Sequence, residues 1–410
     1  MTLPNHFNAV PHFASYPYLR RINYTMNVVI QRCLLILALS GIVLPALAQE
    51  RKSLWDHPLI KRFISPEKDT SRSAGFVVVP ALGYAQETGL EFGLAGVYNF
   101  YANKVDTTIR TSNVTFIGTF TTQRQTNLKL ESDIWTTGNR YHYISELRFR
   151  NFPFHFYGLG NETAARDEDV VLMQLVRVRL EGERELATNY YGGFNIAYER
   201  YRFSDKESGG IFDSMHPYGQ KGGDHLVLGI SQLYDTRNRN TYTTKGHYAR
   251  AKYAYSPGFD GGTNFQGSLV DVDLRTFFPL TSELTLGLNA HYKTTFGSRV
   301  PFYVYPELGG DMMMRGYYNG RYRDRSLLAG QSELRYRFHP RLGVAAFAGT
   351  GSAYHDGLQN TRFIPSYGGG IRYFFDLEHQ SSIRLEYGFG EKRPGEKRQG
   401  GFYLALSEAF

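Results

Sequence analysis

The residues that could do acid–base or nucleophilic chemistry are scattered along this chain. A nucleophilic hydroxyl needs a base within hydrogen-bond reach and a third polar group that orients the base. No Gly-x-Ser-x-Gly motif accompanies the candidate bases: His142, His225, His291 and His379 are scattered along the chain, and His12, His57 and His216 lie outside the expected strands. The sequence therefore predicts no catalytic residues and a protein that is not an enzyme.

Other common site chemistries are equally poorly supported by residue spacing and charge. No His, Cys and Asp spacing suggests zinc, and no glycine-rich loop suggests a phosphate cradle. The net charge is +8, and residues 1–48 hold three arginines and no acids, which leaves a mild, scattered +5 for the remainder. No basic run carries interleaved aromatic residues on one face. We therefore expect no metal, no cofactor and no nucleic-acid partner.

One arginine stands in a long loop between two strand-like segments. Residues 309–318 read Gly-Gly-Asp-Met-Met-Met-Arg-Gly-Tyr-Tyr and lie within the connection 297–326, which we call the Arg315 loop. Loops of this length are usually functional or disordered. Polar or small residues alternate with apolar residues in both flanking segments. In the segment before the loop, the polar or small positions are 285, 287, 289, 291 and 293, and the apolar positions are 284, 286, 288, 290 and 292. In the segment after the loop, the polar positions are 331, 333, 335 and 337, and the apolar positions are 334, 336 and 338. This period of two is typical of β-strands with one polar and one apolar face.

The same alternation, followed by a turn, repeats from Phe76 to the end of the sequence. Val270, Val272 and Leu274, for example, alternate with Asp271 and Asp273. Sixteen strands are expected, at 76–85, 89–101, 108–122, 125–136, 140–152, 169–183, 187–203, 224–234, 246–256, 264–278, 282–297, 327–338, 342–351, 364–375, 381–390 and 400–410. An even number suits a single-chain bacterial barrel, and roughly 21 residues per strand and connection suffice for a tilted crossing.

Composition and connection lengths favour a membrane barrel over a large soluble β-protein. Aromatic residues make up 15% of the chain, with 31 Tyr and 29 Phe, and the mean hydropathy of −0.38 excludes a helical membrane bundle. When the expected strands are numbered along the chain, the short connections follow even-numbered strands; they are 136–140, 278–282, 338–342 and 376–381. The long connections follow odd-numbered strands; they are 152–168, 203–223, 297–326, 352–363 and 390–400. Short inner turns and long outer loops are the asymmetry of outer-membrane barrels.

Several motifs of the second half resemble a known family when taken together and in order. They are Met314-Arg315-Gly316-Tyr317; Asp235 and Arg237 with Gly246; Gly330 to Arg335; and Gly368 and Gly370 with Arg372. The region 76–410 resembles the surface-antigen barrels of the BamA/TamA-like superfamily of bacterial outer membranes. The resemblance implies an all-β fold, a sixteen-stranded antiparallel transmembrane β-barrel, with a long loop between strands eleven and twelve that folds inward.

The resemblance also assigns a role to the tip of the Arg315 loop. In the family the loop arginine contacts inward acids on the following strands, so Arg315, Gly316 and Tyr317 would meet Glu333 inside the barrel. A guanidinium and a carboxylate suit such a site because the fork makes oriented, bidentate hydrogen bonds. Gly349 stands where the family usually has a second acid, so that partner is either missing or supplied elsewhere. A solvated loop arginine is the alternative.

The end of the sequence resembles an outer-membrane assembly signal. Phe402, Leu404, Leu406 and Phe410 alternate, although Glu408 falls where an apolar residue is usual. In the family the first and last strands pair weakly and form a lateral seam. Pro80, in the first expected strand, withholds one hydrogen-bond donor and is consistent with a weak seam.

The N-terminal region is expected to be processed. We interpret 1–25 as an upstream extension, with translation from Met26, and 26–48 as a signal peptide with an apolar run and an Ala-Leu-Ala cleavage site. The only cysteine, Cys33, lies in that run. Residues 49–75 would form a short periplasmic segment, too short for a POTRA domain, before the barrel at 76–410.

The resemblance implies a function in assembling or translocating proteins at the outer membrane. The barrel would act as a monomer in outer-membrane lipid, through the seam and the Arg315 loop, after export by its signal peptide. Unfolded or secreted client proteins and a separate periplasmic partner are the implied partners. The alternative is a passive channel or structural barrel that kept the fold without the activity, as the absent POTRA domains and Gly349 suggest.

Overall fold

The computed structural model describes residues 65, 71–85, 89–205, 209–258, 265–359 and 361–410, all within one compact unit, Ser65–Phe410. The expected extension at 1–25, the signal peptide at 26–48 and most of the 49–75 segment lie outside the described residues. Within the described residues no helix has both the length and the apolar character needed to cross a membrane.

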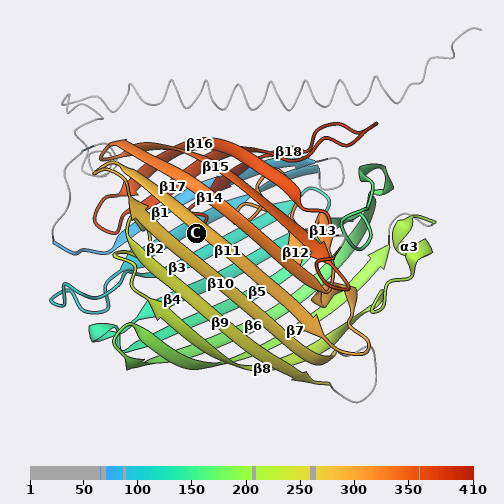
Figure 1. The fold of residues 1–410 in the computed structure, drawn as a ribbon, viewed down its shortest axis with the longest axis horizontal. Coiled ribbons are helices and arrows are strands. Elements are labelled where there is room, and N and C mark those ends of the chain that lie inside the picture. The colour runs from blue at the N-terminus through green and yellow to red at the C-terminus, as the bar shows by residue number, and fades with distance from the viewer. Residues whose placement is uncertain (1–64, 66–70, 86–88, 206–208, 259–264, 360) are drawn as a thin grey trace, which may run out of the picture. The chain divides into compact units, whose positions relative to one another are not determined.

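Sixteen strands form one antiparallel sheet whose order follows the chain (Figure 1). They are β1 (Gly75–Ala85), β2 (Gly89–Phe100), β3 (Ser112–Thr121), β4 (Thr126–Trp135), β5 (Tyr141–Phe156), β6 (Asp169–Ala187), β7 (Tyr190–Asp205), β8 (Gly222–Asp235), β9 (Gly246–Pro257), β10 (Gln266–Pro279), β11 (Leu284–Phe296), β14 (Ser326–His339), β15 (Leu342–Tyr354), β16 (Ile364–Asp376), β17 (Ser381–Phe389) and β18 (Gly400–Ala405). The all-β class and the sixteen antiparallel strands predicted from the sequence are confirmed.

The largest difference from the expected strands is at the end of the sequence. The strand expected over 400–410 ends at Ala405, so Glu408 and Phe410 lie beyond β18. Both side chains are buried against charged and aromatic groups of other strands, which offer them contacts that a continued ladder would not. Alternation alone does not reveal such competing contacts.

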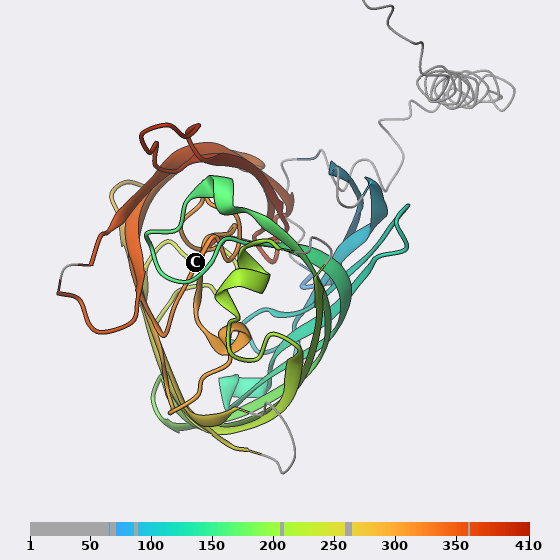
Figure 2. The same ribbon diagram turned by 90° about the vertical axis from the view of Figure 1, so that its right-hand side faces the viewer.

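The long connections carry their own small elements and pack on one another. The Arg315 loop contains β12 (Glu307–Leu308) and β13 (Tyr322–Arg323), which pair with each other, and the 3-10 turn η5 (Phe302–Val304). The short helix α3 (Ile211–Met215) lies in the connection from β7 to β8. Phe212 of α3 packs with Phe302 of η5 and Phe156 of β5. Figure 2 shows these segments gathered at one end of the curved sheet.

The two faces of the sheet have the reverse of the polarity found in soluble proteins. On β14, Leu334 and Tyr336 are 40% and 46% exposed, whereas Glu333 and Arg335 are fully buried. Arginine and glutamate are almost never fully buried unless they are paired. We call the face that carries Glu333 the polar face and the other the apolar face. The apolar face is thus left uncovered by protein along this strand.

The sheet ends at two edge strands, β1 and β18, and no pairing joins them among the described residues. The two ends of the sheet nevertheless meet close to these edges. Asn99, the second-last residue of β2, is buried and donates from Nδ2 to Oγ of Ser381, the first residue of β17, at 2.9 Å. The cost of burying this amide is offset by its hydrogen bond.

An arginine placed on the apolar face distinguishes a lipid-facing surface from a water-facing one. We predict that Leu274→Arg in β10 destabilises the folded protein in lipid vesicles, by about 2–4 kcal/mol at the bilayer centre and less near the interfaces. Leu358→Arg in the connection from β15 to β16 is the matched control, since both leucines are 47% exposed. Urea unfolding of both variants measures the difference, and equal stabilities would show that the apolar face does not meet lipid.

Candidate functional site

The polar face of three strands supplies a cluster of charged side chains at positions set by the ladder. Arg335 of β14 and Glu386 of β17 lie in one transverse row, separated by Ala345 and Gly370. The next row runs Glu333, Phe347, Gly368 and Gly388. Because small residues stand between the charged ones, the sheet leaves room above it for a segment from elsewhere in the chain.

Glycine is required in these rows by close packing. A Cβ on Gly368 would lie 2.6 Å from the ring of Phe347, and a Cβ on Gly370 would lie 2.7 Å from the side chain of Glu386. Both distances are shorter than real Cβ contacts allow. The two motif glycines named from the sequence therefore let neighbouring functional side chains lie flat across β16.

The Arg315 loop fills this space with its arginine. The Nη1 atom of Arg315 donates to both carboxylate oxygens of Glu386, at 3.0 and 2.9 Å, and lies 2.7 Å from Oε2 of Glu333. Its guanidinium carbon stands 3.5 Å from the centre of the Phe347 ring. Arg315 is fully buried. The structure thus brings Arg315 together with Glu333 and with a second acid, Glu386.

The backbone on either side of Arg315 is also held against the sheet. The carbonyl of Arg315 accepts a hydrogen bond from Oγ of Ser366 at 2.5 Å, and the N–H of Gly316 donates to the hydroxyl of Tyr403 at 2.7 Å. Gly316 has φ +106°, a left-handed conformation that glycine adopts without a steric cost. A Cβ on Gly388 would lie 2.5 Å from the nitrogen of Gly316, so the loop rests directly on a bare stretch of β17.

Tyr317 anchors the loop to β16 and to the connection from β17 to β18. Its hydroxyl donates to the carbonyl of Pro365 at 2.5 Å and accepts from the N–H of Glu391 at 2.8 Å. Burial raises the pKa of Tyr317 above its ordinary value, so the phenol keeps its proton and remains a donor. The ring packs with Tyr322 of β13, with ring centres 5.7 Å apart.

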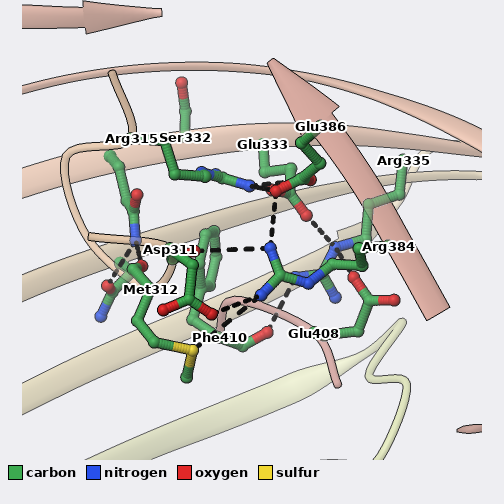
Figure 3. Close-up of polar contacts among 12 residues, drawn as sticks. Asp311, Met312, Arg315, Ser332, Glu333, Arg335, Arg384, Glu386, Glu408 and Phe410 are labelled. Atoms are coloured by element: carbon green, nitrogen blue, oxygen red, sulfur yellow. Dashed lines mark hydrogen bonds and ion pairs between the residues drawn. The ribbon is translucent and has the colours of Figure 1, made fainter. Parts of the chain in front are cut away.

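Three more arginines and one more acid complete the cluster (Figure 3). Arg372 donates to Glu333 at 2.9 Å, to Glu386 at 3.0 Å and to Glu408 at 3.0 Å. Arg384 donates to Glu386 at 2.6 Å and lies 3.4 Å from the carboxylate of Asp311 in the loop. Arg335 completes the set.

Arg335 ties this charged cluster to the last residues of the chain. It donates to Glu333 at 2.7 Å and to the backbone oxygen of Phe410 at 2.7 Å (Figure 3). The ring of Phe410 packs against Phe277 of β10, with ring centres 6.0 Å apart. Glu408, the unusual acid of the terminal pattern, accepts from Ser382 at 2.7 Å. Apart from the irregular position of Glu408, no pattern in the sequence indicates this arrangement.

Four guanidiniums and three carboxylates are therefore buried together. Each of Arg315, Arg335, Arg372 and Arg384 contacts at least one of Glu333, Glu386 and Glu408. The partly exposed carboxylate of Asp311 lies at the edge of the cluster. Buried ions are costly to desolvate, and only good geometry and additional hydrogen bonds compensate for that cost. Such a cluster can hold a loop in one position, and it offers no arrangement of nucleophile and base.

The second acid that contacts Arg315 does not lie on β15, where the family usually carries it, but on β17. Gly349 on β15 has no side chain, and a Cβ there would lie 2.9 Å from Cβ of Gln331. Glu386, two strands further on, supplies the carboxylate. The sequence placed Glu386 on the polar face of an alternating strand, but several acids share that property.

The remaining motif residues lie elsewhere. Asp235, the last residue of β8, accepts two hydrogen bonds from the guanidinium of Arg237, at 2.9 and 2.8 Å. Gly246, with φ +109°, begins β9 where a Cβ would meet the backbone of Thr236. These residues shape the connection from β8 to β9 and do not touch Arg315.

The terminal signal residues divide between two environments. Phe402 and Leu404 are 77% and 62% exposed on β18, and Leu406 is half-buried just beyond that strand. Phe410 is buried. Their role as an assembly signal stays a prediction. Among the described residues, no group of three or more His, Cys, Asp or Glu is placed to hold a metal ion.

Comparison with known proteins identifies related sequences and folds. Residues 82–410 match the Omp85 superfamily domain. No protein with a curated description matches the chain. Among solved structures, BamA from Haemophilus ducreyi lacking POTRA domains 1–3 is similar with a TM-score of 0.52 at 13% identity, over 81% of this chain and 70% of that one.

Two solved structures of CdiB are also similar. CdiB from Escherichia coli has a TM-score of 0.52 at 12% identity, and CdiB from Acinetobacter baumannii has a TM-score of 0.50 at 12% identity. Each comparison covers 82% of this chain and 60% of the CdiB chain. The chain therefore spans about three fifths of the length of these two proteins, and at such low identity the likeness is one of fold.

Removing the loop arginine should weaken the folded state. We predict that Arg315→Ala lowers the free energy of unfolding by about 3–5 kcal/mol, because it leaves buried carboxylates short of a partner. Urea unfolding of the refolded protein measures the loss. Asp311→Asn is the control, since this partly exposed acid is 3.4 Å from Arg384 and should contribute less than about 1 kcal/mol. A variant at Arg315 as stable as the control would contradict the role of the arginine.

A methyl group added beneath the loop should displace it without changing any charge. We predict that Gly388→Ala destabilises the protein by about 1–3 kcal/mol, as overpacking does. Trypsin should then cleave next to the displaced Arg315. Gly330→Ala on β14 is the matched control, because its Cβ would meet only a carbonyl oxygen at 3.8 Å. Equal resistance of both variants to trypsin would show that the loop does not depend on the space above Gly388.

Proposed function

This chain belongs to the Omp85 superfamily, and we propose on that basis that it is an outer-membrane β-barrel that assists the assembly or translocation of other proteins. The proposal follows the implied activity of the BamA/TamA-like barrels that its motifs resemble. It involves no catalytic step. The chain would reach the bacterial outer membrane by signal-peptide export and act there as a monomer.

One observation carries the membrane assignment, namely the reversed polarity of the sheet. Fully buried arginines and glutamates alternate with exposed leucines, tyrosines and phenylalanines along the same strands. An exposed apolar surface on this scale marks contact with a partner or a membrane. In hydrocarbon, every backbone N–H and C=O must find a partner within the protein, which favours a sheet that closes on itself. The apolar face would meet lipid and the polar face would line the lumen.

Contacts between distant strands support a closed barrel. The hydrogen bond from Asn99 of β2 to Ser381 of β17 links the two ends of the sheet. Arg335 of β14 also donates to the carbonyl of Thr243, in the connection from β8 to β9, at 3.3 Å. A flat sheet could not bring β2 and β17, which stand thirteen places apart in strand order, into such contact. The Arg315 loop, held on the polar face, would then lie inside the lumen.

The proposed mechanism combines this seated loop with a weak seam between β1 and β18. The edge strands share no ladder among the described residues, and Pro80 of β1 lacks a backbone donor. Tyr403 of β18 holds the backbone of Gly316 and Tyr317 at the loop tip. The loop would thus steady the last strand while the seam opens toward the membrane for a client chain. Unfolded or secreted proteins would be the clients, with a separate periplasmic protein as partner.

Loss of the protein from cells provides the test. Depletion should lower the amounts of specific outer-membrane or secreted proteins, as measured by quantitative proteomics of both fractions. Wild-type protein should restore them, and Arg315→Ala should restore them less well because the loop is no longer held.

Two results would contradict the assembly role. One is an unchanged proteome after depletion. The other is a large, steady conductance of the purified protein in planar bilayers that is unaffected by substitutions within 309–318, which would favour the passive channel.

A further inference from the structure

A second group of buried charges lies apart from the Arg315 cluster, around a cavity of about 590 Å³. Side chains from β5 to β11 line the cavity, together with residues of the Arg315 loop such as Tyr303 and Tyr318. Seven of the lining side chains are lysines or arginines and four are aspartates or glutamates. The cavity therefore has an excess of positive charge among its lining side chains.

Five of the seven cations have an acidic partner. The ion pairs are Arg177 with Glu199 at 2.9 Å, Arg179 with Glu199 at 2.5 Å, Lys293 with Asp271 at 3.5 Å, Arg323 with Glu307 at 3.1 Å, and Lys252 with Glu181. The other two are Arg148 and Arg150 of β5. Neither side chain makes a hydrogen bond or an ion pair with a described residue, and the Nε atom of each is buried without a partner.

The ladder places Arg148 among other cations. Lys129 of β4 and Arg177 of β6 stand directly opposite Arg148, one on each side. Like charges directly opposite each other on neighbouring strands destabilise a sheet. Arg177 is balanced by Glu199, and Lys129 contacts Glu131 at 2.7 Å. Arg148 is the cation of this row that no acid balances, and a buried polar group left in this state needs a bound ion or another explanation.

We propose that Arg148 and Arg150 form a binding site for a phosphate group in this cavity. Residues two apart on a strand place their side chains on the same face, about 7 Å apart at the backbone. Two guanidinium forks at that spacing can converge on one oxyanion. A carboxylate has only the two oxygens that one fork occupies, whereas a phosphate group offers enough acceptors for both.

The surroundings of the site suit a phosphate that carries a small organic group. The guanidinium of Arg150 lies over the ring of Phe152, 5.3 Å from its centre. Met173, Leu175 and Phe154 continue the wall of the cavity. The ligand is therefore a soluble phosphate or the phosphate of a short lipid. This inference does not depend on the proposed assembly activity.

Thermal unfolding of the purified, folded protein in detergent tests the site. Inorganic phosphate, added at constant ionic strength against chloride, should raise the unfolding midpoint by several degrees and saturate, as expected for a ligand of the native state. The double variant Arg148→Gln, Arg150→Gln should lose this response. Because it relieves repulsion, its midpoint in chloride should equal or exceed that of the wild type, which shows that it folds.

Two further variants and a second probe sharpen the test. Arg200→Gln is the matched control, because Arg200 is exposed, pairs with Asp224 and does not line the cavity. It should keep the full response. Arg148→Lys with Arg150→Lys keeps the charge but not the forks and should respond more weakly. Dihexanoyl phosphatidic acid, as the second probe, identifies a lipid source if it stabilises the protein more than inorganic phosphate does.

Clear results would overturn the proposal. No stabilisation by either probe would do so. An equal shift in the wild type and the double glutamine variant would also do so, because the response would then arise away from Arg148 and Arg150.

Discussion

The fold of this protein depends on burying charge on one face of a sheet and leaving the apolar face uncovered. Glu333 and Arg335 are fully buried on the strand where Leu334 and Tyr336 are exposed. Glu333 and Arg335 tolerate this position because each finds an opposite charge at hydrogen-bonding distance. The constraint therefore acts on pairs of residues, some within one strand and others from different strands. It links the middle of the chain to its end, since Glu333 and Glu408 share Arg372.

The two charged regions of the polar face differ in how their buried charges are balanced. Around Arg315, four arginines share three carboxylates with an acid of the loop nearby, so the charges nearly balance within the protein. Around Arg148, the acids are already committed to other cations, and positive charge remains. The first region is suited to holding a segment of this chain in place. The second has capacity for a partner that the chain does not contain.

The strands were predictable from the sequence because period-two alternation reports directly on a two-sided sheet. The same alternation could place Glu386 on the polar face, yet it could not single it out as the partner of Arg315, because that choice depends on how the loop lies. The shortened last strand was not predictable either, since Glu408 leaves the ladder for Arg372 and Ser382. Side-chain pairing between distant segments is the information that a single sequence does not carry.

Glycines beneath the loop tip bear on how stiff the sheet is at that place. Gly368 pairs with Gly388 in the ladder, and glycine in a strand interior weakens it by removing side-chain packing. Backbone atoms of Arg315 and Gly316 occupy the space above Gly388 that a side chain would otherwise fill. The loop thus supplies the packing that side chains of β17 would otherwise make, next to the edge strand β18. If the Arg315 loop moves away, the sheet loses rigidity next to its edge strand β18. The position of the loop and the compliance of the last strand are therefore mechanically coupled.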